Sequence, residues 1–262
     1  MDRLDANRLE TRLARPDFWR RIVVLETTGS TNDDARRLAA EGAPEGTVVI
    51  AERQTSGRGR LGRVWHSQDR LGLYLSLVLR PAETPDRVGR YAVAAAVAVA
   101  AACRELAGDR VVLKWPNDVL AGGRKLAGIL AELRRGSSGA ELVLGLGINV
   151  GHAERDFPES VAASATSLRM LRQGVAIDRE TVAVLVLQSV AETVVRMREG
   201  AWEEVVERFL RYAPHATGRK VRVASLAEGI TDGLDASGAL RVRTKDGIVL
   251  AHASESVTLL AG

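Results

Sequence analysis

The sequence predicts an α+β fold, in which a mixed, largely antiparallel sheet with packed helices is followed by a small C-terminal β-barrel. Up to about residue 214, short apolar segments of strand-like composition alternate with segments of helical periodicity. After Pro214, short runs of alternating apolar residues are separated by glycines, which is typical of a small antiparallel barrel of about five strands. We therefore predict a large domain over residues 1–214 and a small β domain over residues 215–262.

Composition supports a globular chain in a reducing compartment. At ~150 residues per domain, 262 residues give about 1.7 domains. The content of 46% apolar and 27% charged residues is ordinary for a soluble protein, and the net charge is only +4. A single cysteine excludes a disulfide framework. The N-terminus has no apolar signal region, and the run Ala92–Cys103 is shorter than the ~20 residues of a membrane span. We expect a cytoplasmic protein that does not contact membranes.

The N-terminal elements follow from caps and breakers. Residues 1–20 predict a short helix, broken at Pro16, and residues 22–25 a strand. Ser30 or Thr31 as N-cap, with two aspartates in the first turn, predicts a helix through residues 35–41, which Gly42 and Pro44 end. The next predicted elements are strands over 47–51 and 73–79, a helix over about 85–106 and a strand over 111–115 that Pro116 stops.

The C-terminal elements follow from periodicity. Two apolar runs, 125–133 and 141–148, predict a hairpin joined by Gly136–Gly139. Helical spacing of apolar residues predicts helices over 178–199 and 202–212. The strands of the barrel are predicted at Val221/Val223, Leu240/Val242, Ile248/Leu250 and Val257/Leu259, with Gly229, Gly233, Gly238 and Gly247 between them.

A glycine- and arginine-rich loop, GRGRLGR, is the sharpest chemical signal. Gly57, Gly59 and Gly62 fit G-x-G-x-x-G, but a dinucleotide site needs a helix to begin within that motif, and here a strand over 73–79 follows. The three interleaved arginines are suited to binding a carboxylate or a phosphate. We expect a loop that is mobile when empty and ordered by an anionic ligand; the alternative is a solvated basic turn.

Three further motifs follow the loop. In KWPND, Lys114 beside Asn117 and Asp118 suits a phosphate–Mg²⁺ site, although a Pro–Asn–Asp turn that closes a hairpin is an equal alternative. In KLAGIL, Lys125 enters an otherwise apolar strand whose central Gly128 indicates close approach by a ligand or another backbone; the alternative is an edge-strand lysine with a bulge glycine. In GLGIN, two glycines again leave space, and the terminal asparagine is able to bind an amide or purine edge; the alternative is a strand that ends in an Asn turn.

These motifs, in this order, resemble those of the biotin–protein ligases, and the resemblance extends over nearly the whole chain from about residue 20. It implies a class II synthetase-like catalytic domain with a C-terminal SH3-like barrel. It also implies biotin and ATP as substrates with Mg²⁺, and the biotin carboxyl carrier protein of acetyl-CoA carboxylase or a related enzyme as partner. The stretches that carry it are Ser30-Thr31-Asn32, Gln54 with GRGRLGR and Trp65, Lys114–Asp118, Lys125–Leu130 and Gly145–Asn149.

The resemblance also implies roles for single residues. It places Lys114 at the junction of carboxylate and phosphate, and gives Asp118 either Mg²⁺ or the proton of the acceptor lysine. Catalytic roles fall to Lys114, Arg58 and Asp118. The implied adenylate contacts are Arg58, Arg60, Arg63, Lys114, Asn117 and Asn149. The implied biotin contacts are Ser30, Thr31, Asn32, Gln54, Gly57, Arg58, Gly59, Arg60, Trp65, Lys125, Gly128 and Gly147.

The sequence departs from the pattern of the biotin–protein ligases in two places, and two alternative functions stay open. Only about 25 residues precede the Ser-Thr-Asn segment, too few for the helix-turn-helix module of repressor-type relatives, so we expect a monofunctional enzyme without sequence-specific DNA binding. The segment after Trp65 lacks an expected proline. A lipoate or octanoate ligase or transferase is the nearest alternative, and a nucleic-acid-binding module is one from another class, although aromatic residues are only 4%. We expect a monomer or a weak homodimer.

Overall fold

A seven-stranded mixed sheet forms the centre of the computed structural model, which describes residues 3–15, 17–82, 87–136, 139–224, 227–253, 255 and 257–260. The strand order is β1-β2-β3-β7-β6-β5-β4. Only β1 and β2 run parallel, and the other neighbours are antiparallel, which confirms the predicted mixed sheet. The strands are β1 (Arg21–Thr28), β2 (Thr47–Gln54), β3 (Gly72–Leu79), β4 (Val111–Lys114), β5 (Asp118–Ala121), β6 (Arg124–Gly136) and β7 (Gly139–Asn149).

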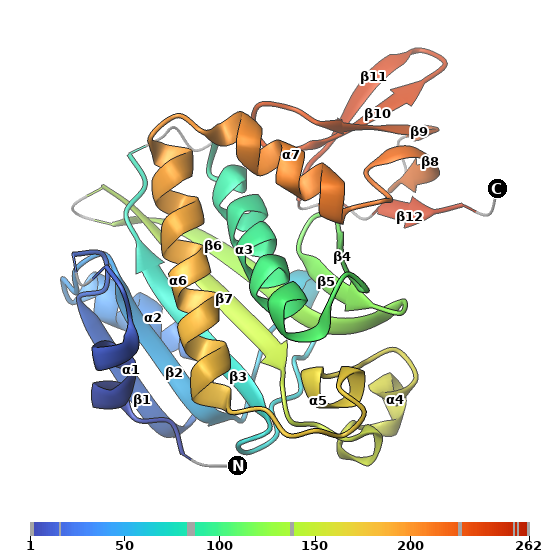
Figure 1. Cartoon of the computed structure of the whole chain (residues 1–262). Coiled ribbons are helices and arrows are strands. Elements are labelled where there is room, and N and C mark those ends of the chain that lie inside the picture. Colours follow the sequence, from blue (N-terminus) through green and yellow to red (C-terminus); the bar gives the residue numbers. More distant parts are fainter. Residues whose placement is uncertain are drawn as a thin grey trace.

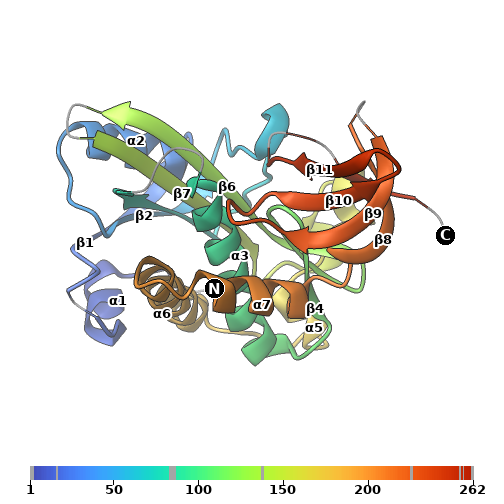
Figure 2. The same cartoon turned by 90° about the horizontal axis from the view of Figure 1, so that it is seen from above.

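Helices cover both faces of this sheet. The long helices α3 and α6 lie on one face and α2 lies on the other (Figures 1 and 2). Of the two predicted N-cap residues, Ser30 takes the N-cap position of α2 with an extended backbone, but its hydroxyl makes no capping hydrogen bond. The helices are α1 (Ala6–Arg12), α2 (Thr31–Ala40), α3 (Gly89–Ala107), α4 (Glu159–Ala162), α5 (Leu168–Leu171), α6 (Arg179–Arg198) and α7 (Trp202–Tyr212), with 3₁₀ turns η1 (Arg60–Gly62) and η3 (Glu154–Asp156). None of the helices in the described part of the chain is long and apolar enough to cross a membrane.

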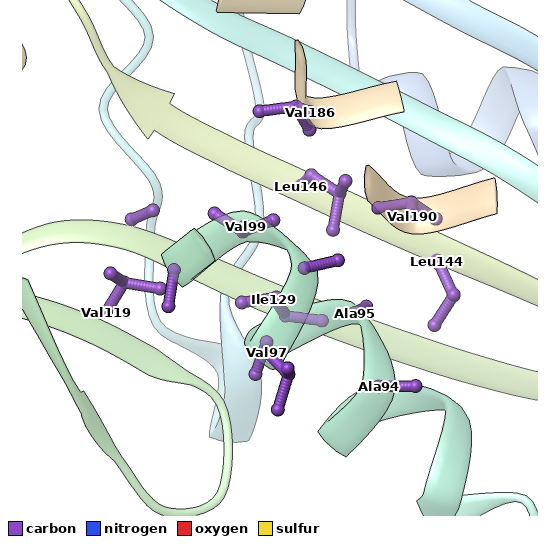
Figure 3. Packing of buried hydrophobic residues seen from close by; sticks show 14 of the residues in the cluster. Ala94, Ala95, Val97, Val99, Val119, Ile129, Leu144, Leu146, Val186 and Val190 are labelled. Atoms are coloured by element: carbon purple, nitrogen blue, oxygen red, sulfur yellow. The ribbon is translucent and has the colours of Figure 1, made fainter. Parts of the chain in front are cut away.

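The main core lies between the sheet and helices α3 and α6. Alanines of α3, including Ala95, let that helix approach the sheet, and Ile129 of β6 packs beside it. Leu146 of β7 packs beside Val186 of α6 (Figure 3). Because side chains alternate along a strand, the leucines at even positions of β7 face this core, and its odd positions face α2. Two of those odd positions, Gly145 and Gly147, carry no side chain, which lets the side chains of Asn32 and Trp65 lie against this face of the sheet.

The C-terminal strands form a second, antiparallel sheet of order β11-β10-β9-β8-β12, which agrees with the predicted five-stranded unit. Among the described residues, no pairing between β11 and β12 closes it into a ring. One strand, β9, was not located: Gly229 and Gly233 were predicted between strands but lie within it, and a Cβ at Gly229 would be 2.5 Å from the carbonyl oxygen of Arg243. The glycine thus marks close approach of β10, not a turn. The strands are β8 (Thr217–Val223), β9 (Ala227–Leu234), β10 (Leu240–Thr244), β11 (Gly247–Ala251) and β12 (Val257–Leu259).

The sequence did not predict every element of the structure, and some of its predictions fall on residues that the structure does not describe. Strand β5 and the short helices α4 and α5 were not predicted, because four-residue segments carry too little periodicity to be recognised. The predicted boundary near 214–217 falls between α7 and β8. Pro16, the predicted helix start at residues 85–86 and the Ser137–Ser138 tip of the hairpin lie outside the described residues.

Candidate functional site

The face of the sheet beside α2 carries a cavity of about 280 Å³. Its walls are the start of α2, strands β6 and β7, the arginine-rich loop and the segment 157–165. Two of the residues that the sequence assigned to the site, Gly57 and Lys114, do not line it. The cavity brings together all the others: Ser30, Thr31, Asn32, Gln54, Arg58, Gly59, Arg60, Arg63, Trp65, Asn117, Asp118, Lys125, Gly128, Gly147 and Asn149.

A hydrogen-bonded polar cluster occupies one end of the cavity. The backbone N–H and the hydroxyl of Thr31 both donate to Oε1 of Gln54, at 2.9 and 3.1 Å. The side-chain amide of Asn32 donates to Glu132 at 2.6 Å, and its Oδ1 accepts from the hydroxyl of Ser76 at 2.5 Å. The two Ser76 and Thr31 hydroxyls are 2.8 Å apart. These groups therefore hold each other in fixed orientations at the cavity wall.

Ser76 and Glu132 are members of this cluster that sequence reasoning missed. Ser76 is fully buried in the middle of a leucine-rich strand, and Glu132 lies near the exposed end of β6. A lone serine at an otherwise apolar strand position is the signal that could have pointed to Ser76, because a buried hydroxyl needs partners. No comparable local signal marks Glu132, since its partner Asn32 is 100 residues away in the sequence.

The arginine-rich loop folds back on itself. The N–H of Trp65 donates to the carbonyl of Gly57 at 2.9 Å, and the N–H of Gly59 donates to that of Arg63 at 2.7 Å. A Cβ at Gly57 would lie 2.5 Å from the Trp65 carbonyl oxygen, so this glycine permits loop closure. Only the 3₁₀ turn η1 occurs within the motif, with Leu61 at φ 56°. The helix that a dinucleotide site requires is therefore missing at this place.

Two paired glycines form the floor of the cavity. Gly128 and Gly147 are cross-strand partners in β6 and β7. A Cβ at either one would be 3.1 and 2.5 Å, respectively, from the ring of Trp65, which lies over them. The Nζ of Lys125 is 5.6 Å from the centre of the same ring. The sequence predicted that a ligand or another backbone approaches Gly128; the group that approaches both glycines is instead the Trp65 indole.

Two arginines of the loop, Arg58 and Arg60, are already held by protein acceptors. Arg58 contacts both carboxylate oxygens of Asp33, at 2.5 and 2.9 Å, and this ion pair keeps the pKa of Asp33 below its ordinary value. Arg60 donates to Oδ1 of Asn117 at 2.9 Å and also to the carbonyl of Ala253. Burial lowers the pKa of Arg60. An anionic ligand at the cavity would thus meet positioned guanidinium groups, one of them tied to the C-terminal sheet.

The two lysines of the motifs have different surroundings. The Nζ of Lys125 is 2.6 Å from Oδ1 of Asp118, and both line the cavity. Lys114 is directly opposite Asp118 in the β4–β5 pair but lies outside the cavity lining. Burial, together with the charges of Arg219 and Lys114, lowers the pKa of His215. The cation at the centre of the cavity is therefore Lys125, and Lys114 lies towards the C-terminal sheet.

The far wall of the cavity was not predicted. It is formed by Phe157, Val161, Ser164 and Ala165 from the segment that contains η3 and α4. The amide of Asn149 donates to the carbonyls of Thr166 at 3.0 Å and of Lys125 at 3.3 Å, and so ties the end of this segment to β6. This wall of the cavity is mainly apolar, unlike the polar cluster at the opposite end of the cavity.

The donors in the cavity fit a metal ion that arrives with a phosphate ligand. Within the described part of the chain, no group of three or more His, Cys, Asp or Glu residues could hold a metal ion. Asp118 is the only carboxylate among the described residues that line the cavity. Mg²⁺ is commonly bound by one or two carboxylates together with substrate phosphates and water. A single carboxylate next to a phosphate site satisfies that requirement.

Fold and site together define a ligand-binding α+β domain that joins a polar recognition cluster, a central lysine and a cationic loop. Residues 24–149 match the model of the biotin/lipoate A/B protein ligase family. The biotin–[acetyl-CoA-carboxylase] ligase of Paracoccus denitrificans is 32% identical over 249 residues, which cover 88% of this chain and 98% of that protein. The chain belongs to the biotin/lipoate A/B protein ligase family.

Other relatives agree with this membership. The biotin protein ligase of Aquifex aeolicus, solved in complex with biotin and ATP, is 30% identical and superposes with a TM-score of 0.79. The alignment covers 92% of this chain and 100% of that one. The bifunctional ligase/repressor BirA of Bacillus subtilis is 42% identical over 148 residues, or 56% of this chain. That match spans 46% of the BirA sequence, so the chain matches about half the length of this relative.

Proposed function

We propose that the protein is an ATP-dependent biotin–protein ligase. In the first step a carboxylate oxygen of biotin bonds to the α-phosphorus of ATP and the bond to the pyrophosphate oxygen breaks, which gives biotinyl-5′-AMP and pyrophosphate. In the second step the uncharged amine of a carrier-protein lysine attacks the acyl carbon. The bond to the AMP oxygen then breaks, and the amine loses a proton.

The order of groups along β6 supports this proposal. The polar cluster lies beside Leu130 and Glu132, and Lys125 lies five residues before Leu130 on the same strand, with its Nζ 3.4 Å from where a Cβ of Gly128 would be. Hydroxyl and amide groups suit the donors and the acceptor of the ureido ring of biotin. The valeryl chain would then run along the Trp65 indole, which covers Gly128 and Gly147, and its carboxylate would reach Lys125. The nucleotide would follow beyond Lys125, near Asn117 and Asn149.

The chemistry of the first step explains the cations. Biotin carboxylate and ATP are both anions, so their approach requires positive groups at the reacting atoms. Lys125 is suited to the junction of the two, and Arg58, Arg60 and Arg63 to the flanking phosphates. Mg²⁺, which enters with ATP, neutralises phosphate charge. Asp118 is available to that ion or to the proton of the acceptor lysine.

One observation carries the proposal: a single cavity joins the polar cluster, Lys125 and the arginine-rich loop. The test is biotin-dependent exchange of labelled pyrophosphate into ATP by the purified protein with Mg²⁺. Exchange with biotin, and none with lipoate or octanoate, is the expected result. Exchange with lipoate or octanoate but not biotin would move the protein to the other branch of its family. No exchange with any of the acids, from protein shown to be folded, would contradict the ligase proposal.

Ser76→Ala is expected to weaken biotin binding without loss of fold. It removes the hydroxyl partner of Asn32 Oδ1 and Thr31, and one unsatisfied buried group costs about 1–3 kcal/mol. We expect the Kd for biotin, measured by titration calorimetry, to rise by about 5- to 100-fold, whereas the KM for ATP stays within a factor of two. Ser56→Ala, at an exposed position that follows β2, is the matched control. An unchanged Kd would remove Ser76 from the biotin site.

A further inference from the structure

Arg124, the first residue of β6, is bonded to three acceptors in the segment that forms the far wall of the cavity. Its Nε donates to the carbonyl of Ala165 at 2.7 Å, and its Nη2 donates to the carbonyl of Ala162 at 2.8 Å. Nη2 also lies 3.2 Å from Oε1 of Glu154. One guanidinium group thus spans a segment of twelve residues, from Glu154 in η3 to Ala165, three residues after the end of α4.

The internal hydrogen bonds of this segment contribute little to its stability. Helix α4 has four residues and η3 has three, lengths at which helical hydrogen bonds do not offset the cost of nucleation. The backbone bonds from Lys125 reach only its end: Lys125 N–H donates to Ser164 at 2.7 Å, and Thr166 N–H donates to Lys125 at 2.9 Å. Phe157 at the other end stacks on His152, with ring centres 4.8 Å apart. Between these two ends, Arg124 is the side chain from β6 that holds α4.

The two carbonyl bonds matter more than the ion pair. The side chain of Glu154 is 68% exposed, and ion pairs of this kind contribute little in water. The carbonyls of Ala162 and Ala165 point at two different nitrogens of one planar group. A guanidinium group meets such a pair in a fixed geometry, whereas the flexible point charge of a lysine does not.

We propose that Arg124 is a positioning residue for the nucleotide: it holds the Phe157–Ala165 wall against β6, so that the apolar side of the wall is in place for the base of ATP. The proposal rests on the proposed function. If biotin lies along β6 with its carboxylate at Lys125, the nucleotide lies beyond Lys125, towards the start of β6. The wall begins there, at Ser164 and Ala165 beside Lys125. The polar cluster lies at the opposite end, so biotin recognition does not depend on the wall.

Arg124→Ala is expected to change the KM for ATP without changing the KM for biotin. The KM for ATP in pyrophosphate exchange rises at least five-fold, and the KM for biotin and kcat stay within a factor of two. Arg124→Lys reverses less than half of the rise in the KM for ATP, because a lysine cannot reproduce the two hydrogen bonds to carbonyl groups. Glu154→Gln stays within a factor of two of the original protein. Arg134→Ala, an exposed arginine of the same strand, is the matched control and is expected to have no effect.

Hydrogen–deuterium exchange of the ligand-free protein tests the structural half separately. In Arg124→Ala the amides of residues 154–165 are expected to exchange at least ten-fold faster, and those of β7 at the original rate. Faster exchange without a change in the KM for ATP, or an equal rise of both KM values, would overturn the positioning role. If the unsubstituted protein shows no exchange with biotin, the ligase proposal fails. The amide measurement then still decides whether Arg124 holds the wall.

Discussion

Lys125→Met is expected to reduce biotin-dependent pyrophosphate exchange by about 10²- to 10³-fold, the usual loss when one group that stabilises developing charge is removed. Lys125 is the lysine that lines the cavity, between the polar cluster and the apolar wall. Its loss also leaves the Asp118 carboxylate, 2.6 Å from Nζ, without that neutralising partner beside two anionic substrates. Two effects therefore add: a lost attraction and a new repulsion.

A second substitution separates these effects. In Lys125→Met with Asp118→Asn the repulsion is removed, so part of the exchange rate is expected to return if Asp118 serves the acceptor lysine, and none if it holds Mg²⁺. The matched control is Lys114→Met, which removes a lysine of the same site region that does not line the cavity. We expect it to lose less than Lys125→Met. The sequence resemblance placed Lys114 at the reacting atoms, and a greater loss in Lys114→Met would favour that assignment.

Arg179→Met is expected to lower the free energy of unfolding by about 3–5 kcal/mol, the usual cost of removing one partner from a buried ion pair. The Nη2 of Arg179 lies 2.6 Å from Oε2 of Glu52, and these side chains are 1% and 0% exposed. Glu52 also accepts the N–H of Leu4 at 2.7 Å, so the pair joins the N-terminal segment, β2 and the start of α6. Urea denaturation followed by far-UV circular dichroism measures the loss.

The same helix supplies the control for this prediction. Arg196 and Glu204 are also 2.6 Å apart, but their side chains are 61% and 58% exposed. Arg196→Met is expected to cost less than about 1 kcal/mol, because water screens an exposed pair. The double variant Arg179→Met with Glu52→Gln should be more stable than the sum of the two single changes predicts, because neither charge is left buried alone. Equal losses for Arg179→Met and Arg196→Met would contradict the argument from burial.

The amino-acid sequence by itself determined the fold class and most elements. Alternating apolar residues and glycines between strands predicted the C-terminal sheet, and a Ser30 cap followed by two aspartates predicted α2. These signals are local: each depends on residues within one turn or one strand. The glycines of GLGIN and KLAGIL indicated close approach for the same reason, and the structure places the Trp65 indole over two of them.

Only the tertiary structure decided how the site is assembled. It paired Asn32 with Glu132 and Ser76, and it tied a wall at residues 157–165 to Arg124. It also placed Lys125 rather than Lys114 in the cavity, although both lysines lie in apolar strands of similar sequence. Strand register and the face on which a side chain emerges follow from long-range pairing, and the site contacts named above join residues 41 to 100 positions apart. A one-residue shift in register reverses that face, so no local pattern fixes which groups meet.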